Sequence, residues 1–328
     1  MQFSLTRIVL AILLVGGAVA VAEVVVKTLK GVLSLGGAVP AIYYIVYLIA
    51  SVLVAYFLYR AYVHLVEKRT VTELSAAGAS GELGVGMLVG LGMVSTIVGA
   101  LWLLGDYHVT EFGVWTAVFV LLANNGAGAF VEEVLLRGVV FRISEEQLGT
   151  WIALAISALL FVLLHLASPN ATVVSAIIVG IEGGILLSAA YVLTRRLWLA
   201  IGIHFAWDFS QDAIFGTSSG VTGFVKAELT GPALLSGGSS GIEGSVLALL
   251  VCLAVSAYLL VRARRKGNFV RPFRTRQDHR QGSAAEGGQP CGGTLGSVVA
   301  WGRERSTVGK PRSVPTSQRP TPGWRACA

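Results

Sequence analysis

Long apolar segments recur along the chain up to residue 261, and they limit what it can fold into. A helix needs about 20 mostly apolar residues to cross a bilayer, and eight segments approach or exceed that length: Leu5–Val26, Ala41–Leu65, Val85–Leu104, Val114–Phe141, Thr150–Ala167, Thr172–Thr194, Leu197–Phe215 and Ser245–Val261. Of the 328 residues, 54% are hydrophobic and 13% are charged, and the mean hydropathy is +0.72, which excludes an ordinary soluble domain. The sequence therefore predicts an all-α polytopic membrane protein with about eight transmembrane helices.

The basic residues are concentrated after the last apolar segment. From Arg262 onward there are 14 Lys and Arg against three acidic residues, whereas Met1–Val261 has 11 against 15. A basic tail after a final span is typical of the cytoplasmic side and of contact with anionic lipid heads, so we expect membrane lipid and no nucleic acid as a partner. With the N-terminus in the cytoplasm, the same side also receives Arg7, Arg60, Lys68, Arg69, Arg142, Arg195 and Arg196. This asymmetry predicts a multi-pass protein of the cell membrane with both termini cytoplasmic.

The segments at the two ends and between the last two spans have their own signatures. Arg7, the apolar run after it and the triplet at residues 20–22 imitate a cleavable secretory signal, although an uncleaved first span is favoured. Gly216–Gly244 is rich in Gly, Ser and Thr and predicts a structured extramembrane loop. The basic tail, residues 263–328, is rich in Gly, Pro, Ser, Thr and Arg and predicts disorder. The three cysteines are far apart, which predicts neither a disulfide framework nor a CxxC zinc site.

Three charged residues lie inside the fourth apolar segment, in the stretch AFVEEVLLRGVVF. A charge in hydrocarbon costs about 2.5 to 3.5 kcal/mol on insertion scales, so its presence indicates a function and a partner. Glu133 and Arg137 are four residues apart and share a helix face, which predicts a local ion pair. Glu132 points about 100° away round the helix, and without a local counter-ion it suits the role of a general base. The alternative from this helix alone is a structural ion pair with a spare acid facing a watery cleft.

Two other apolar segments bring histidines toward mid-span. FVLLH places Phe161 and His165 one turn apart, and HFAWD places His204 and Asp208 one turn apart on one face. A count from the inner boundary at 1.5 Å per residue puts His204 roughly 10 Å deep and Glu132 and Asp208 roughly 15 Å deep. The same count gives roughly 22 Å for His165, which is too deep to be level with the others unless the fifth span is tilted or starts late. A single histidine on an apolar helix is more often a packing residue, but polar groups from three helices favour a site.

The three motifs stand in a characteristic order. EEVLLR fits EExxxR, FVLLH fits FxxxH and HFAWD fits HxxxN/D, in successive spans. In this order they resemble the CAAX prenyl protease and bacteriocin-processing (CPBP) family of intramembrane glutamate proteases. The resemblance covers about Val114–Phe209, and the later segment GPALLSGGSSGIEGS is also similar to what members have there. Each motif alone is a weak signal, whereas three in order are specific.

The resemblance implies an eight-helix protease whose cavity opens to the cytoplasm. In such a protease Glu132 and His165 activate a water, and His204 with Asp208 steadies the oxyanion. Peptide hydrolysis needs a base for water, donors for the oxyanion and an acid for the leaving amine, and a glutamate with imidazoles can supply all three. Many members have Asn where this chain has Asp208, and an ionised aspartate cannot donate to an oxyanion. It would be protonated, or it would orient His204.

The remaining motif residues, Glu133, Arg137 and Phe161, are predicted to hold the site in place. The resemblance implies metal-independent chemistry, so we expect no cofactor and no metal. It also implies a substrate that is a membrane-associated peptide or a lipidated, possibly prenylated, protein. On this basis residues 113–262 form the catalytic membrane core, and residues 1–112 supply three N-terminal helices.

Other functions remain open on the sequence. Two histidines and a glutamate are also a zinc ligand set, as in a zinc-dependent membrane protease, although no HExxH occurs. A non-catalytic membrane protein could use Glu132, His165 and His204 as a proton or ion relay, or could sequester a peptide as a scaffold or immunity protein.

Glu182 lies alone in the sixth apolar segment, within VGIEGGI, and fits none of the motifs. No role is predicted for it. The glycines around it, Gly180, Gly183 and Gly184, predict close packing against a neighbouring helix.

Overall fold

The computed structural model describes residues 4–17, 28, 31, 41–167, 172–218, 221 and 223–272. All of them belong to one compact unit, Met1–Gly282. Its helices are α1 (Ser4–Ala11) with η1 (Ile12–Gly16), α3 (Ala41–Tyr62) with η3 (Val63–Glu67), α4 (Ala79–Leu104), α5 (Ala117–Glu133) with η4 (Val134–Phe141) and α6 (Arg142–Leu148), α7 (Thr150–Leu166), α8 (Val173–Val179) with η5 (Gly180–Leu186) and α9 (Leu187–Thr194), α10 (Trp198–Phe209) with η6 (Ser210–Phe215), α11 (Ala233–Ser236), η7 (Gly238–Gly244) and α12 (Val246–Arg265). The short segment η7 is a 3₁₀ helix, and the other η segments are π-helical stretches that continue an α-helix.

Several of these helical runs are long and apolar enough to cross a membrane. Within the described residues there are five: Ala41–Glu67, Ala79–Leu104, Ala117–Leu148, Val173–Thr194 and Gly238–Arg265. Leu5–Gly16 and Thr150–Leu166 are shorter apolar helices. The predicted helical membrane architecture is thus confirmed in outline, while the count of eight spans is not. The seventh expected span, α10 with η6, falls outside the five because polar side chains lower its hydropathy.

Part of the sequence-based outline falls on residues that the structure leaves undescribed or does not test. The signal-like triplet at residues 20–22 and most of the tail lie outside the described residues. The division at residues 112 and 262 and the orientation in the membrane remain predictions.

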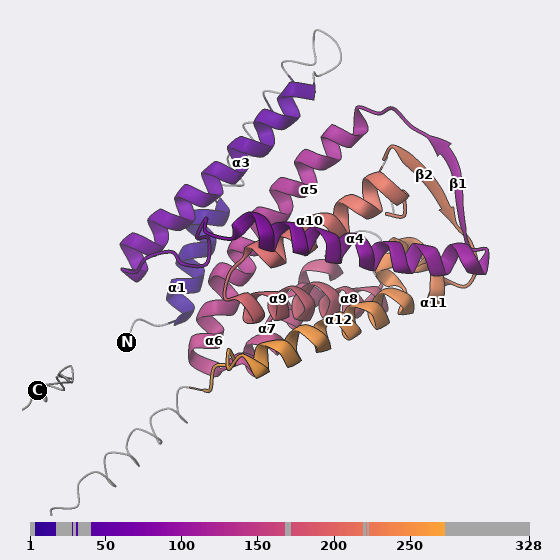
Figure 1. Ribbon diagram of the computed structural model, residues 1–328. Helices are drawn as coiled ribbons and strands as arrows, with labels where there is room; N and C mark the ends of the chain where they lie inside the picture. The colour runs from indigo at the N-terminus through magenta and orange to yellow at the C-terminus, as the bar shows by residue number, and fades with distance from the viewer. Residues whose placement is uncertain are drawn as a thin grey trace, which may run out of the picture. The chain divides into compact units, whose positions relative to one another are not determined.

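Glycines allow α4 and α10 to cross in close contact (Figure 1). A Cβ added to Gly86 would lie 2.5 Å from the carbonyl oxygen of Leu199, and one added to Gly90 would lie 2.6 Å from that of Ile203. Two small residues four apart are the usual means by which membrane helices bring their backbones together. The contact fixes the position of α10, the helix that contains the HFAWD motif.

The glycines around Glu182 pack in the same way against α7. A Cβ on Gly184 would lie 2.4 Å from the Cα of Ala158, and one on Gly180 would lie 3.0 Å from the carbonyl oxygen of that residue. Gly183 faces the ring of Phe161, and a Cβ added to Gly183 would lie 2.4 Å from a carbon of that ring. The close packing predicted for these glycines is therefore confirmed, and it brings η5 directly against the FxxxH helix.

A two-stranded antiparallel sheet lies outside the helices. Strand β1 (Tyr107–Phe112) follows α4, and β2 (Val225–Leu229) follows η6 (Figure 1). Together with α11 and η7, β2 gives the predicted loop, Gly216–Gly244, a defined structure over its described residues. The last turn of this loop returns to the helices, because η7 packs against α8.

The start of the predicted disordered tail is ordered, so that prediction is wrong for residues 263–272, the first three of which belong to α12. The last carbonyls of a helix have no donor within the helix, and the side chain of Asn268 donates to the carbonyls of Val192 (3.0 Å) and Leu193 (2.9 Å) in α9. Val270 and Thr150 exchange two hydrogen bonds at the start of α7. The chain after α12 therefore caps two helices before it leaves the described region.

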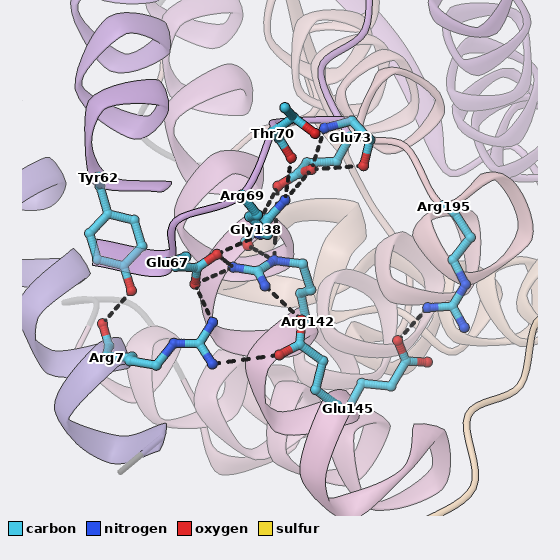
Figure 2. A network of polar contacts seen from close by, with 12 residues as sticks. Arg7, Tyr62, Glu67, Arg69, Thr70, Glu73, Gly138, Arg142, Glu145 and Arg195 are labelled. Carbon is cyan, nitrogen blue, oxygen red and sulfur yellow. Dashed lines mark hydrogen bonds and ion pairs between the residues drawn. The ribbon is translucent and has the colours of Figure 1, made fainter. Parts of the chain in front are cut away.

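A buried cluster of ion pairs joins the N-terminal helices to the helix of the EExxxR motif (Figure 2). Glu67, whose side chain is 1% exposed, accepts hydrogen bonds from Arg7 (2.7 Å), Arg69 (2.7 Å) and Arg142 (2.6 Å). These arginines come from α1, the segment after η3, and α6, so their helix ends lie on one side of the bundle. The asymmetry of basic residues in the sequence predicts the same side of the membrane for these three arginines.

The second carboxylate of this cluster, Glu73, is held by five donors and also reaches the motif helix. Arg69 donates to it twice (3.0 and 2.6 Å), and the backbone and hydroxyl of Thr72 donate at 2.9 and 3.4 Å. The Tyr59 hydroxyl contacts both Glu73 and the carbonyl oxygen of Gly138 in η4. Arg142 donates to the same carbonyl at 2.8 Å. The cluster thus fixes the backbone next to Arg137.

This arrangement predicts an acid-sensitive contribution to stability from Glu73. Burial acts to raise the pKa of this carboxyl, but hydrogen bonds from Arg69, Tyr59 and the backbone outweigh it and hold the pKa at about 2, against 4.5 ordinarily. Because the folded-state pKa is the lower one, the stabilisation is complete above about pH 4.5 and is lost as the pH falls toward about 2. At about 1.4 kcal/mol per pKa unit, the loss is on the order of 3 kcal/mol of unfolding free energy.

The thermal midpoint in detergent, measured from about pH 6 to about pH 3 for the wild type and Glu73→Gln, checks this prediction. The variant should be less stable at pH 6, and the gap between the two proteins should narrow as the pH falls. Parallel curves for the two proteins would show that Glu73 does not titrate as inferred.

Candidate functional site

Glu133 and Arg137 form a fully buried ion pair one helical turn apart. Arg137 Nη1 donates to Glu133 Oε1 at 2.7 Å, and both side chains are 0% exposed. The pair predicted from the spacing is therefore present. Arg137 Nη2 also donates to the carbonyl oxygen of Gly183, which joins the motif helix to η5. Buried charges persist only when they are paired and hydrogen-bonded, and here each of the two side chains provides the other's ion-pair partner.

His204 contacts the same carboxylate and two others. Glu133 Oε1 lies 2.9 Å from His204 Nδ1. Because this oxygen belongs to a carboxylate paired with arginine, Nδ1 bears the hydrogen and donates it. The second ring nitrogen, Nε2, lies 3.4 Å from Asp208 Oδ2 and 3.8 Å from Glu132 Oε2. One imidazole therefore lies among the acids of both the EExxxR and the HxxxD motifs.

Phe161 links the buried arginine to the second histidine. The guanidinium carbon of Arg137 lies 4.6 Å from the centre of the Phe161 ring, a cation–π contact. The rings of Phe161 and His165 are stacked, with centroids 5.9 Å apart and an interplanar angle of 14°. His165 Nδ1 donates to the carbonyl oxygen of Phe161 at 3.0 Å. Since a carbonyl only accepts, the neutral ring keeps Nε2 as its proton acceptor.

The four residues predicted to react line one cavity of about 190 Å³: Glu132, His165, His204 and Asp208. The side chains of Glu132 and Asp208 are 53% and 31% exposed, whereas that of His204 is 11% exposed. The carboxylates of Glu132 and Asp208 are therefore accessible from outside the protein, whereas the imidazole of His204 is largely covered. Of the positioning residues, Phe161 lines the cavity too.

The mismatch in depth between His165 and Glu132 disappears, because the motif helix is longer than expected. That helix was assumed to end at Phe141, but it continues through α6 to Leu148 before the turn at Gly149. Glu132 therefore lies about 17 residues before the turn and His165 about 16 residues after it, which is roughly 25 Å for each at 1.5 Å per residue. The two side chains are level, and this explains why they share a cavity.

Two further acids line the same cavity, and the motifs identified neither. Glu182, in η5, is 4% exposed, and neither of its carboxylate oxygens has a hydrogen-bond partner among the described residues. Glu243, in η7, accepts hydrogen bonds from Trp207 Nε1 (3.2 Å) and Gln211 Nε2 (3.0 Å). An acid within an apolar segment was a signal for Glu182. For Glu243 the signal was only the resemblance of the segment GPALLSGGSSGIEGS to the family, since an acid in a Gly/Ser-rich loop is normally solvated.

The backbone of the site helices departs from a regular α-helix next to the cavity. The π-helical segment η4 begins directly after Glu133, η5 contains Glu182, and η6 begins two residues after Asp208. Single π-helical turns within α-helices occur frequently at functional sites, where they re-aim side chains. Their positions here coincide with three of the helices that form the cavity.

An apolar groove of about 470 Å³ adjoins the polar cavity. It shares three residues with the cavity, Glu132, Phe161 and His165. The rest of its lining is aliphatic: Ile12, Leu135, Leu136, Val140, Leu160 and Leu164. A polar space and a hydrocarbon-like space therefore meet at the two side chains predicted to activate water.

The nitrogen and oxygen donors of the cavity also bear on metal binding. Within residues 4–17, 41–167, 172–218 and 223–272, no group of three or more His, Cys, Asp or Glu side chains is arranged to hold a metal ion. Both Nδ1 atoms of the site imidazoles are engaged in hydrogen bonds, to a carboxylate and to a carbonyl.

A comparison with protein families bears on the same residues. Residues 113–210 match the family model described as type II CAAX prenyl endopeptidase Rce1-like. The recognition based on the three motifs is thereby confirmed, because the match extends from the start of α5 to the end of α10 and includes Glu132, His165 and His204. No curated protein and no solved structure matches the chain.

The match over residues 113–210 and the helices long and apolar enough to cross a membrane together indicate a multi-pass membrane protein of the intramembrane endopeptidase type. The Rce1-like segment includes Glu182 but ends before Glu243 and before α12. The cavity is thus completed by residues outside the matched segment.

Proposed function

We propose that this protein hydrolyses a peptide bond of a lipid-bearing substrate with a water activated by Glu132 and His165, without a metal. The supporting observation is that these two side chains line both the polar cavity and the apolar groove. A peptide in the cavity can leave its prenyl or acyl chain in the groove. The scissile bond then lies where the two spaces meet.

The reaction follows from the hydrogen-bond pattern. Glu132, with Nε2 of His165 in reach of the same cavity, removes a proton from water, and the oxygen adds to the peptide carbonyl carbon. His204 acts as an imidazolium: its Nδ1–H donates to Glu133, its Nε2–H donates to the developing oxyanion, and Asp208 orients that second nitrogen. The C–N bond then breaks, and the proton held by Glu132 passes to the leaving amine. A single well-placed oxyanion donor is worth about 10² to 10³ in kcat.

Purified protein in detergent, given a farnesylated peptide and the same peptide without lipid, tests this function. We expect cleavage of both, faster for the lipidated peptide, with products identified by mass spectrometry. Activity should survive a strong chelator. Loss on chelation with recovery on adding Zn²⁺ would establish a zinc protease instead, and tight peptide binding without cleavage would establish a scaffold.

The groove predicts a separate effect of Leu160→Trp. Filling the groove with an indole should lower kcat/KM for the lipidated peptide about tenfold or more, since each excluded CH₂ group forfeits about 0.8 kcal/mol of burial. The unlipidated peptide should be little affected. Leu159→Trp is the matched control, because Leu159 is an exposed neighbour that does not line the groove. Equal losses on both peptides would contradict a lipid site here.

A further inference from the structure

Glu182 has an environment that the proposed reaction does not explain. Its side chain lines the polar cavity and is 4% exposed, and both carboxylate oxygens lack a hydrogen-bond partner among the described residues. A buried carboxylate without donors is costly, because it loses its hydration and gains nothing in return. A donor that enters the cavity from outside would remove this cost.

Glu243 is the contrasting member of the same lining. Its Oε1 accepts from the indole of Trp207 and from the amide of Gln211, so its orientation is fixed. Neither donor is charged, and neither neutralises the carboxylate. Glu243 is held in place by two neutral donors, and Glu182 has no donor. Together the two carboxylates can bind a positively charged group that has several N–H donors.

The charges of the lining favour the same kind of group. Four acids face the cavity, Glu132, Asp208, Glu182 and Glu243, against two imidazoles. No Lys or Arg belongs to the described lining, and the nearby Arg137 is already paired with Glu133. A cavity whose charges have one sign concentrates ligands of the other sign.

The size of the cavity limits the occupant. About 190 Å³ is smaller than the roughly 300 to 1,000 Å³ of pockets for drug-sized ligands. It suits one long side chain better than a folded segment. The aliphatic stem of a Lys or Arg could lie along the apolar part of the lining, Val179, Leu186 and Leu187, while its cationic head reaches the two acids.

We propose that Glu182 and Glu243 form a specificity subsite for a basic side chain, Lys or Arg, that lies close to the scissile bond of the substrate. This inference rests on the proposed function, since it assigns the substrate chemistry of the same cavity. It makes the protein a protease with two preferences, a lipid chain in the apolar groove and a cation in the acidic end of the polar cavity.

The first experiment measures kcat/KM for a lipidated peptide series. Lys or norleucine, which has a similar stem without the charge, is placed at each of the positions flanking the cleaved bond. At one position the wild type should prefer Lys about tenfold or more. In Glu182→Gln and in Glu243→Gln the ratio should fall to about one to two, because the amide keeps the shape and loses the charge. Glu228→Gln is the control, since this acid is exposed on β2, and its ratio should equal that of the wild type.

The second experiment needs no catalysis. n-Butylammonium should raise the thermal midpoint of the wild type in detergent more than n-butanol does at equal ionic strength, because a ligand that binds the folded state stabilises it. The difference should disappear in Glu182→Gln. If that variant does not fold, Glu243→Gln serves, because its amide oxygen can still accept from Trp207 and Gln211.

The two experiments separate the subsite from the proposed function. Cleavage by the wild type with no Lys preference at any position, or with a preference unchanged in both variants, overturns the subsite and leaves the protease intact. Absence of all cleavage together with binding of n-butylammonium that depends on Glu182 overturns the protease and keeps the cation site.

Discussion

Glu132→Gln is expected to lower kcat for peptide hydrolysis roughly 10²- to 10⁴-fold, the range by which a positioned general base accelerates a reaction. Glutamine has the same shape but cannot take a proton from water. The fold should survive the change, because the Glu132 side chain is 53% exposed and its charged contact with His204 is 3.8 Å long. That imidazole keeps its closer carboxylates, Glu133 at 2.9 Å and Asp208 at 3.4 Å.

The measurement is single-turnover cleavage of the lipidated peptide beside the thermal midpoint of the same preparation. Glu228→Gln is the control for loss of one acid and should cleave at the wild-type rate. If Glu132→Gln turns over normally, the base is another residue, and His165, whose Nε2 is its proton acceptor, becomes the candidate. A large loss of midpoint in Glu132→Gln would mean that the acid supports the fold and would make the activity loss uninformative.

Arg137→Met is expected to cost about 3 to 5 kcal/mol of stability, because it leaves the carboxylate of Glu133 buried without its ion-pair partner. Both side chains are 0% exposed, and the arginine also donates to Gly183 and lies over Phe161. The readouts are the yield of folded protein and its midpoint in detergent. Activity should fall only in proportion to the folded fraction.

The double variant Glu133→Gln with Arg137→Met should recover part of this loss of stability, since it removes the unpaired buried charge. The stability change of the double variant minus the sum of the two single changes measures the coupling between the two side chains. The exposed pair of Lys226 with Glu111, 2.8 Å apart, provides a control in which Lys226→Met should change stability by less than about 1 kcal/mol. A fully stable but inactive Arg137→Met would contradict a bracing role and place the arginine at the chemistry.

Local geometry explains why part of the site could be predicted from the sequence. Residues four apart in a helix lie on one face whatever surrounds them, so the pairing of Glu133 with Arg137 and the proximity of Phe161 to His165 followed from spacing alone. The Rce1-like match supports the order of the motifs. The glycines beside Glu182 were interpreted correctly for a similar reason, because only a residue without a Cβ tolerates a helix backbone as close as that of Ala158.

Distances between helices were decided by the tertiary structure. The depth of His165 relative to Glu132 depended on where the preceding helix ended. The end of the apolar segment did not mark the end of that helix, because the charged residues that follow, such as Arg142 and Glu145, are buried in ion pairs. Glu243 reached the cavity because a loop folded back against α8, which no local pattern encodes. The sequence by itself determined a helical membrane protein with three one-turn motifs, since these depend on hydropathy and on the helical period. Only packing decided that acids from separate helices and a loop share one cavity, because their positions depend on contacts between segments far apart in the chain.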